Sequence, residues 1–206
     1  MRKFDFCVVD VETANQSRHS ICQIGVACFQ AGKMVESWQS LVDPEEPFNG
    51  FNVALHGISP ELVAGAPNWS GVFPEVVRLL EGEAVASHTD FDRAALTLAC
   101  EKAQLEPVVY GKWLDTCRLA RAAFPETPNH KLTTLARCFS IHYKAHDALE
   151  DARVAGMVLA MALERRGVSV AELLAMPVRH IGSFPGDKTE APRKRAHAFQ
   201  LRTKAF

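Results

Sequence analysis

The chain has 206 residues, of which 48% are hydrophobic, which is enough for one domain with a full core plus an appendage and excludes a disordered protein. No run approaches the roughly 20 apolar residues that a membrane-spanning helix needs, and the N-terminus lacks a signal-peptide cleavage pattern. We therefore expect a soluble, cytoplasmic protein with no membrane partner. The six cysteines form no Cys-x-x-Cys pair and mostly lie among apolar residues, which indicates reduced core thiols and neither disulfides nor a zinc site.

The formal net charge of -1 conceals an uneven distribution of charge along the chain. Six of the 23 Lys and Arg residues, but only two of the 24 acids, lie between 187 and 206. Apolar periodicity also ends near residue 176, so we expect a domain over 1–176 and a basic, flexible C-terminal tail over 177–206. Such a tail is ordinarily a solvated end; the alternative is that it binds a polyanion through phosphate contacts.

The first predicted element is a buried strand over 4–13, rich in valine and phenylalanine, with two acids, Asp10 and Glu12, at its far end. Side chains at i and i+2 of a strand point to the same face, so the two carboxylates form one acidic surface. Paired carboxylates that lose hydration repel each other unless a cation or a shared proton compensates them, which favours a divalent metal. The alternative for so short a motif is a solvated strand end.

Two more strands, over 21–29 and 34–42, follow after short links and predict an antiparallel meander. The polar loop over 13–20 then lies beside the acidic pair, where a ligand would enter. The His56-Gly57 pair, just before a helix start at Ser59-Pro60, indicates either close backbone approach by a ligand or a simple turn. Further strands are expected over 83–87 and 113–116, and helices over 70–80, 92–103, 119–124, 132–139 and 146–164.

Five polar residues lie at or just before the starts of two predicted helices. Asp92 falls in the first turn of the helix after the strand over 83–87, where an ordinary N-terminal helix acid is the alternative. In the longest helix, Asp147 is the expected N-cap and Glu150 completes a capping-box-like start. His146 lies just outside this helix and Asp151 about one turn inside it, so both can face one cavity.

Four acids at element ends, Asp10, Glu12, Asp92 and Asp151, match what two magnesium or manganese ions require, because these hard cations prefer oxygen ligands. The single His146 supplies too few nitrogens for a zinc site. Its imidazole suits a general base near neutral pH.

Taken together, these segments resemble the three motifs of the DnaQ-like (DEDDh) 3′-to-5′ exonucleases. The motifs are Asp10-Val11-Glu12-Thr13, then His88 with Phe91-Asp92, then His146 to Ala152. Two other segments are similar to that family: His56-Gly57-Ile58, and Asp115-Thr116 with Leu119-Ala120-Arg121. The match covers about 1–165 in the right order, and 12–15 and 20–25 are similar to stand-alone bacterial members of the polymerase III epsilon-subunit-like or exonuclease X-like type. The implied fold is α/β, a ribonuclease H-like mixed five-stranded sheet flanked by helices.

The resemblance implies a 3′-to-5′ exonuclease that releases nucleoside monophosphates from the 3′ end of single-stranded DNA, acting in repair or replication. Two Mg²⁺ or Mn²⁺ ions would be held by Asp10, Glu12, Asp92 and Asp151, with Asp10 bridging both, and His146 would be the general base. Segments expected to contact the substrate are Thr13, Ala14, His56, Gly57, Ile58, His88 and Phe91.

Departures from the family pattern leave substrate preference open. Thr89 replaces the usual asparagine after the motif histidine, Ser59 replaces a threonine, and Ala14-Asn15 replaces the common Thr-Gly. One alternative is the same chemistry on RNA or very short oligonucleotides. The other is a non-catalytic module that docks on a polymerase. A polymerase or repair protein is the candidate partner in either case, and the alternatives for the oligomeric state are a monomer and a homodimer.

Overall fold

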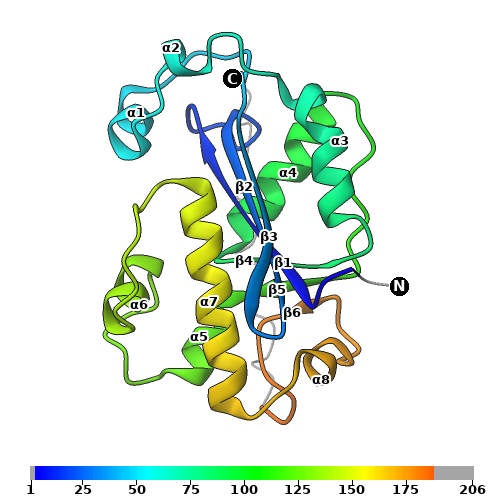
Figure 1. Cartoon of the computed structure of the whole chain (residues 1–206). Helices are drawn as coiled ribbons and strands as arrows, with labels where there is room; N and C mark the ends of the chain where they lie inside the picture. Colours follow the sequence, from blue (N-terminus) through cyan, green and yellow to red (C-terminus); the bar gives the residue numbers. More distant parts are fainter. Residues whose placement is uncertain (1–2, 188–206) are drawn as a thin grey trace, which may run out of the picture.

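A mixed six-stranded sheet forms the centre of the protein, which a computed structural model describes over residues 3–187. The strand order is β3-β2-β1-β4-β5-β6. The first three strands are antiparallel, whereas β4, β5 and β6 run parallel to β1 (Figure 1). The strands are β1 (Phe6–Thr13), β2 (Ile21–Gln30), β3 (Lys33–Leu41), β4 (Ala84–Ser87), β5 (Lys112–Asp115) and β6 (His180–Ile181). This architecture confirms the predicted α/β fold, with one strand more than expected.

Helices cover both faces of the sheet (Figure 1). One face packs against α5 (Thr116–Ala123), α6 (Leu132–Cys138), α7 (Ala148–Arg166) and α8 (Val170–Leu174), and the other against α3 (Trp69–Leu80) and α4 (Asp90–Lys102). Because side chains alternate along a strand, Phe6 and Val8 enter the first core while Cys7 and Val9 enter the second. The even-numbered acids of β1 therefore lie on the α7 side.

Two glycines let α7 lie unusually close to the sheet. A Cβ at Gly25 of β2 would stand 2.3 Å from the backbone nitrogen of Leu149, and one at Gly156 of α7 would stand 2.1 Å from the ring of Phe29. Such separations are far inside van der Waals contact, so any larger residue would push helix and sheet apart. Gly25 pairs with Asp10 in the sheet, which brings the start of α7 directly beside the acids.

Three short elements escaped the sequence-based prediction: α1 (Gly50–His56), α8 and β6. Each is too short to show a clear apolar period. Helix α1 is defined by its ends, because the Asn49 side chain accepts from Phe51 N–H and Gly57 adopts the left-handed conformation with φ 77°. The short helix α2 (Pro60–Val63) begins at Ser59, as expected.

Packed structure continues beyond residue 176, the predicted end of the domain. Ile181 of β6 pairs with β5, and the side chains of Ile181 and Phe184 are almost fully buried. The last part of the predicted tail, 188–206, lies outside the described residues. Within 3–187, no helix combines the length and the apolar character needed to cross a membrane.

The expected capping box of α7 is only half formed. Asp147 is the N-cap and accepts a hydrogen bond from Glu150 N–H, but the Glu150 carboxylate pairs with Arg153 instead of turning back to the cap. A guanidinium is the stronger partner for a carboxylate. The complete capping box lies at α8, between Ser169 and Glu172.

Candidate active site

Four carboxylates gather at the carboxyl end of β1. Asp10 and Glu12 lie on the strand itself, Asp92 in the first turn of α4 and Asp151 in the first turn of α7. The Val11 backbone N–H donates to Asp92 Oδ1 over 3.1 Å and so fixes the start of α4 against β1. The acids that the sequence singled out therefore come from three separate elements and form one cluster.

Burial, followed by the charges of neighbouring acids, raises the pKa values of the acids in this cluster. Burial raises the pKa of Asp10 well above its usual range, and Asp92, Asp151 and Glu12 raise it further. Burial, followed by Asp151 and Asp92, raises the pKa of Glu12 to about 8. The pKa of Asp92 rises to about 7 through burial, against the lowering effect of its hydrogen bond from Val11. In this environment the carboxylates cannot all ionise at neutral pH without added positive charge.

Divalent metal ions are the compensation that suits these donors. The cluster offers carboxylate oxygens and one imidazole, the pattern preferred by Mg²⁺ and Mn²⁺, and no thiolate. One ligand atom each from Glu12, His146 and Asp151 can lie within 4.8 Å of one another, which is compact enough to share an ion or a bound water. The residues present therefore fit a divalent metal site.

His146 lies at the rim of the cluster in a constrained conformation. Its backbone has φ 62°, which is unfavourable for a side chain other than glycine, and its N–H donates to Asp151 Oδ2 over 2.7 Å. The imidazole Nδ1 is 3.9 Å from Glu12 Oε1, and the side chain is 42% exposed. The imidazole therefore lies near the Glu12 carboxylate and is open to solvent on its other side.

The start of α7 is held in place by residues that sequence reasoning missed. Gln23 of β2 accepts the Ala148 N–H through its Oε1 at 3.0 Å, and Gly25 leaves room for the helix above the strand. Together they hold the start of α7 close to β1, where the charge of Asp151 raises the pKa of Asp10. An isolated glycine inside an apolar strand is a signal of close backbone approach, so Gly25 could have been recognised from the sequence.

Four of the residues predicted to contact the substrate, Thr13, Ala14, His56 and Ile58, lie together between β1 and α1. We refer to this group as the wall. His56 Nδ1 accepts from Ile58 N–H at 3.0 Å, so its Nε2 carries the proton that faces the Thr13 carbonyl oxygen at 3.2 Å. Burial lowers the pKa of His56 and keeps it neutral. Ala14 and Ile58 pack in one small apolar cluster, and Asn52, which the sequence did not indicate, also donates to the Thr13 carbonyl at 2.8 Å.

His88 and Phe91 have different surroundings from each other. Both ring nitrogens of His88 are engaged within the fold, Nδ1 with Thr116 Oγ1 at 3.0 Å and Nε2 with the His130 carbonyl at 2.8 Å. This ring therefore ties the end of β4 to α5, and its role toward substrate stays a prediction. Phe91 is 36% exposed at the start of α4, with the guanidinium of Arg18 5.2 Å from its ring centroid. Arg18 carried no signal in the sequence.

Tyr143 is another neighbour of the cluster that the sequence did not indicate. Burial, together with the negative charge of Asp151, raises the pKa of the Tyr143 phenol, so the hydroxyl keeps its proton. A neutral phenol beside Asp151 adds no further negative charge to the acids.

Residues 7–159 match the family model RNase_T, described as an exonuclease. The 3′-5′ exonuclease DinG of Bacillus subtilis is 31% identical over 170 residues, which cover 80% of this chain and 18% of that protein. A DNA polymerase III of PolC type from Caldanaerobacter subterraneus subsp. tengcongensis is 30% identical over 165 residues, 78% of this chain and 12% of the relative. The chain thus spans less than a fifth of the length of these two proteins.

Solved structures share the fold. Exonuclease X in complex with 5′ overhanging duplex DNA has a TM-score of 0.64 and 21% identity, covering 81% of this chain and 95% of that one. The nuclease domain of 3′hExo, a DEDDh family member bound to rAMP, has a TM-score of 0.65 and 20% identity over 79% and 93% of the two chains. E. coli exonuclease I with a dA16 oligonucleotide has a TM-score of 0.69 and 16% identity over 79% and 41%. With the family model covering most of its length, this chain belongs to the RNase_T exonuclease family.

Proposed function

We propose that the protein is a metal-dependent 3′-to-5′ exonuclease that removes nucleoside monophosphates from the 3′ end of single-stranded DNA. The observation that supports this most strongly is the cluster of four acids, which has no sufficient positive charge of its own and lies beside a half-exposed histidine. Such a cluster favours bound cations at neutral pH, and bound cations attract phosphate oxygens. Membership of the exonuclease family narrows the reaction to hydrolysis of a phosphodiester.

Asp10, Glu12, Asp92 and Asp151 would hold two Mg²⁺ or Mn²⁺ ions. When bound, such ions lower the pKa of water and neutralise phosphate charge. His146 Nδ1, which faces Glu12, would accept the proton of the attacking water. The strained backbone of His146, anchored on Asp151, would hold the imidazole in that position.

The wall beside β1 would bind the terminal nucleotide. Thr13 and Gly57 would approach it through the backbone, while His56, Ala14 and Ile58 stabilise the wall from behind. Phe91 would provide an exposed aromatic face on which a base can stack. A pocket that grips a chain end favours release of single nucleotides over internal cutting.

RNA is the alternative substrate, because the solved neighbours include complexes with DNA and with rAMP. The PolC-type relatives are DNA polymerases, which supports a role in replication or repair and a polymerase or repair partner. The rival role as a non-catalytic docking module is disfavoured, since the four acids and His146 are all in place.

Digestion of 5′-labelled single-stranded DNA and matched RNA tests the proposal. The reactions contain magnesium, manganese or chelator, and Asp10→Asn serves as the inactive control. The expected result is a ladder that shortens from the 3′ end only with metal and only in the wild type. The digestion rates of the DNA and the RNA strand then rank the two substrates. A folded protein that binds metal but digests neither strand would overturn the exonuclease proposal in favour of the docking module.

A further inference from the structure

A second cavity, distinct from the acidic cluster, lies between the start of α4, the segment before β5, and β6. Its volume is about 540 Å³, and Tyr110 and Trp113 contribute to its lining. Three permanent cations line it, namely Arg93, Lys112 and Arg179, against a single carboxylate, Glu106. We refer to it as the basic pocket. Its positive character stands out in a chain with a formal net charge of -1.

The cations of the basic pocket are positioned by the fold. Lys112 Nζ donates to the carbonyl oxygens of Met176 and Val178 at 2.7 and 2.9 Å, so its charge is fixed there by neutral partners. Arg179 is exposed directly before β6. A fixed ammonium beside an exposed guanidinium attracts an anion without a large loss of side-chain entropy.

Asp90 connects the basic pocket to the proposed active site. Its Oδ1 lies 3.6 Å from Arg93 Nε and 3.1 Å from His180 Nε2, and both of these residues line the pocket. The next residues of α4 are Phe91 and Asp92, which belong to the acidic end of the sheet. The guanidinium of Arg18 lies over Phe91, so cationic groups occur at both sides of the α4 start.

The register of the sheet gives the separation between the two sites. His180 is level with Trp113 on β5, with Val85 on β4 and thus with Cys7 on β1, three residues before Asp10 and three strands away. Strands lie about 4.8 Å apart and rise about 3.3 Å per residue, which gives about 17 Å in the plane of the sheet. Trp113 packs on the α3–α4 face of the sheet and the acids of β1 lie on the α7 face, so this in-plane span is a minimum. A stacked strand with about 3.4 Å per nucleotide needs about five nucleotides or more to cover it.

We propose that the basic pocket binds the phosphate backbone of the substrate strand about five nucleotides or more from the 3′ end that is cut. The inference rests on the proposed function and adds to it a preference for strands long enough to reach the pocket. Spaced cations beside aromatic rings suit a single strand, since phosphates pair with the cations and bases stack on the rings. Continuity with the acidic cluster through Asp90 favours nucleic acid over an acidic segment of a partner protein.

Cleavage of two substrate lengths by Arg179→Glu tests the assignment. On strands of about 12 nucleotides, loss of a phosphate contact should lower kcat/KM about tenfold at low salt and reduce the salt slope by about 0.7 or more. On a trinucleotide, which cannot reach the pocket, the variant should match the wild type. Lys33→Glu carries the same charge change on an exposed residue at the β2–β3 turn, the opposite end of the sheet, and should lower neither rate.

Arg93→Gln provides a second, milder change in the same pocket and should show the same length dependence. Equal losses of kcat/KM on both substrate lengths would overturn the assignment. No loss on either length would also overturn it, and an acidic protein segment would then be the better candidate for the basic pocket. If the wild type cleaves neither strand, the exonuclease proposal fails separately. Fluorescence anisotropy with labelled strands of both lengths then measures whether the variants lose affinity for the longer strand but not for the trinucleotide.

Discussion

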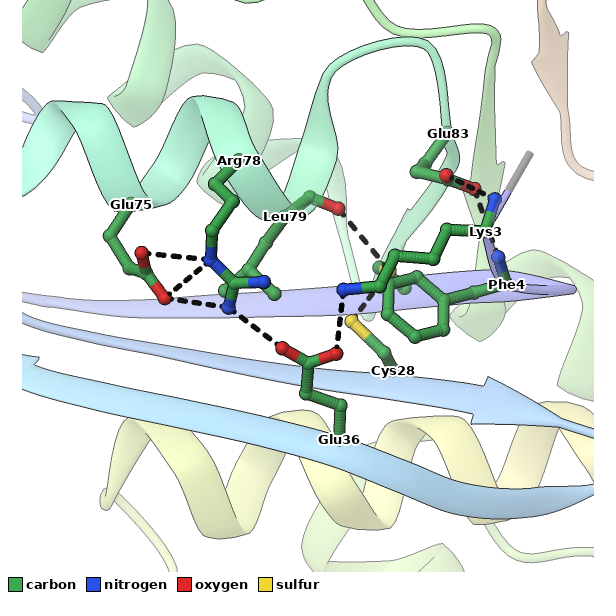
Figure 2. A network of polar contacts seen from close by, with 9 residues as sticks. Lys3, Phe4, Cys28, Glu36, Glu75, Arg78, Leu79 and Glu83 are labelled. Carbon is green, nitrogen blue, oxygen red and sulfur yellow. Dashed lines mark hydrogen bonds and ion pairs between the residues drawn. The ribbon is translucent and has the colours of Figure 1, made fainter. Parts of the chain in front are cut away.

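Carboxylates near the two ends of strand β1 have opposite electrostatic surroundings. Near the start of β1, Glu36 of β3 pairs with Lys3 Nζ at 2.9 Å and with Arg78 of α3 at 2.7 Å, and Arg78 also holds Glu75 at 2.6 Å (Figure 2). Hydrogen bonds from Lys3 and Arg78 lower the pKa of Glu36. At the other end, burial and neighbouring acids raise the pKa of Glu12 to about 8.

This difference indicates that the acidic end of β1 is a functional site. Carboxylates whose only role is structural have their counter-cations within the chain, as in the network of Figure 2. The carboxylates around Asp10 have mainly one another, so the folded protein holds repulsion that external cations relieve. Retaining such repulsion in a folded domain is a signature of a functional site.

Replacing Asp10 should have the largest effect on activity. Asp10→Asn removes a charged oxygen ligand from the centre of the cluster, so we expect turnover to be abolished in the gel assay. Without metal, the same change should raise the melting temperature, because it relieves repulsion from Asp92 and Glu12. Near-normal activity in this variant would contradict the two-metal assignment.

The next largest effect should come from His146. His146→Ala should lower the rate by roughly 100- to 10,000-fold while metal binding persists, because the base is lost and the carboxylates remain. Single-turnover rates with saturating Mg²⁺ measure this. His142→Ala, an exposed histidine in the same loop, is the matched control. A loss of less than tenfold would exclude His146 as the base.

Gly25→Ala tests whether the acidic end depends on close packing of α7. The new methyl group would meet the backbone of Ala148 and Leu149 at 2.3 to 2.5 Å, so we expect a loss of about 1–3 kcal/mol in the free energy of unfolding. Displacement of Asp151 should also weaken metal binding. Gly50→Ala, where no atom lies within 4 Å of the new Cβ, should leave both unchanged. Equal behaviour of the two variants in urea unfolding and metal titration would remove Gly25 from this role.

The smallest effect is expected at the paired end. Glu36→Gln disrupts two partly exposed ion pairs, which are typically worth about 0.2–1 kcal/mol each, and should leave exonuclease activity intact. Urea unfolding and the gel assay measure the two effects. A large loss of activity would show that the two ends are coupled and would break the comparison.

The sequence predicted the acidic cluster because its members lie at the ends of strongly patterned elements. Asp10 and Glu12 end an apolar strand, and Asp92 and Asp151 begin helices with clear apolar periods. Their convergence follows from the order of motifs in the family. The α/β fold class was predictable because most of its strands and helices carry equally clear patterns.

Other parts of the site depend on contacts that no local pattern encodes. Arg18 and Asn52 are surface-type residues whose importance arises only when distant segments meet, at Phe91 and Thr13 respectively. Strand β6 has two residues and forms because β5 offers an edge, so no periodicity could reveal it. The pairing of Lys112 with two carbonyl oxygens likewise needed the structure.

The central claim, that the acidic end lacks compensation until metal binds, is tested most directly by thermal unfolding against pH, with chelator and with Mg²⁺. In the metal-free protein the pKa of Glu12 is raised to about 8 and that of Asp92 to about 7, so the folded state binds more protons than the unfolded state. Stability from these groups is therefore full below about pH 4 and is lost as pH rises toward about 8, at up to about 1.4 kcal/mol per pH unit and proton.

Mg²⁺ should remove this loss, because bound metal replaces the protons, and Asp10→Asn should flatten the metal-free slope between about pH 5 and 8. A metal-free melting temperature that falls across this range in chelator and holds steady in Mg²⁺ is the predicted result. A melting temperature that is flat in chelator and unmoved by Mg²⁺ would contradict the account.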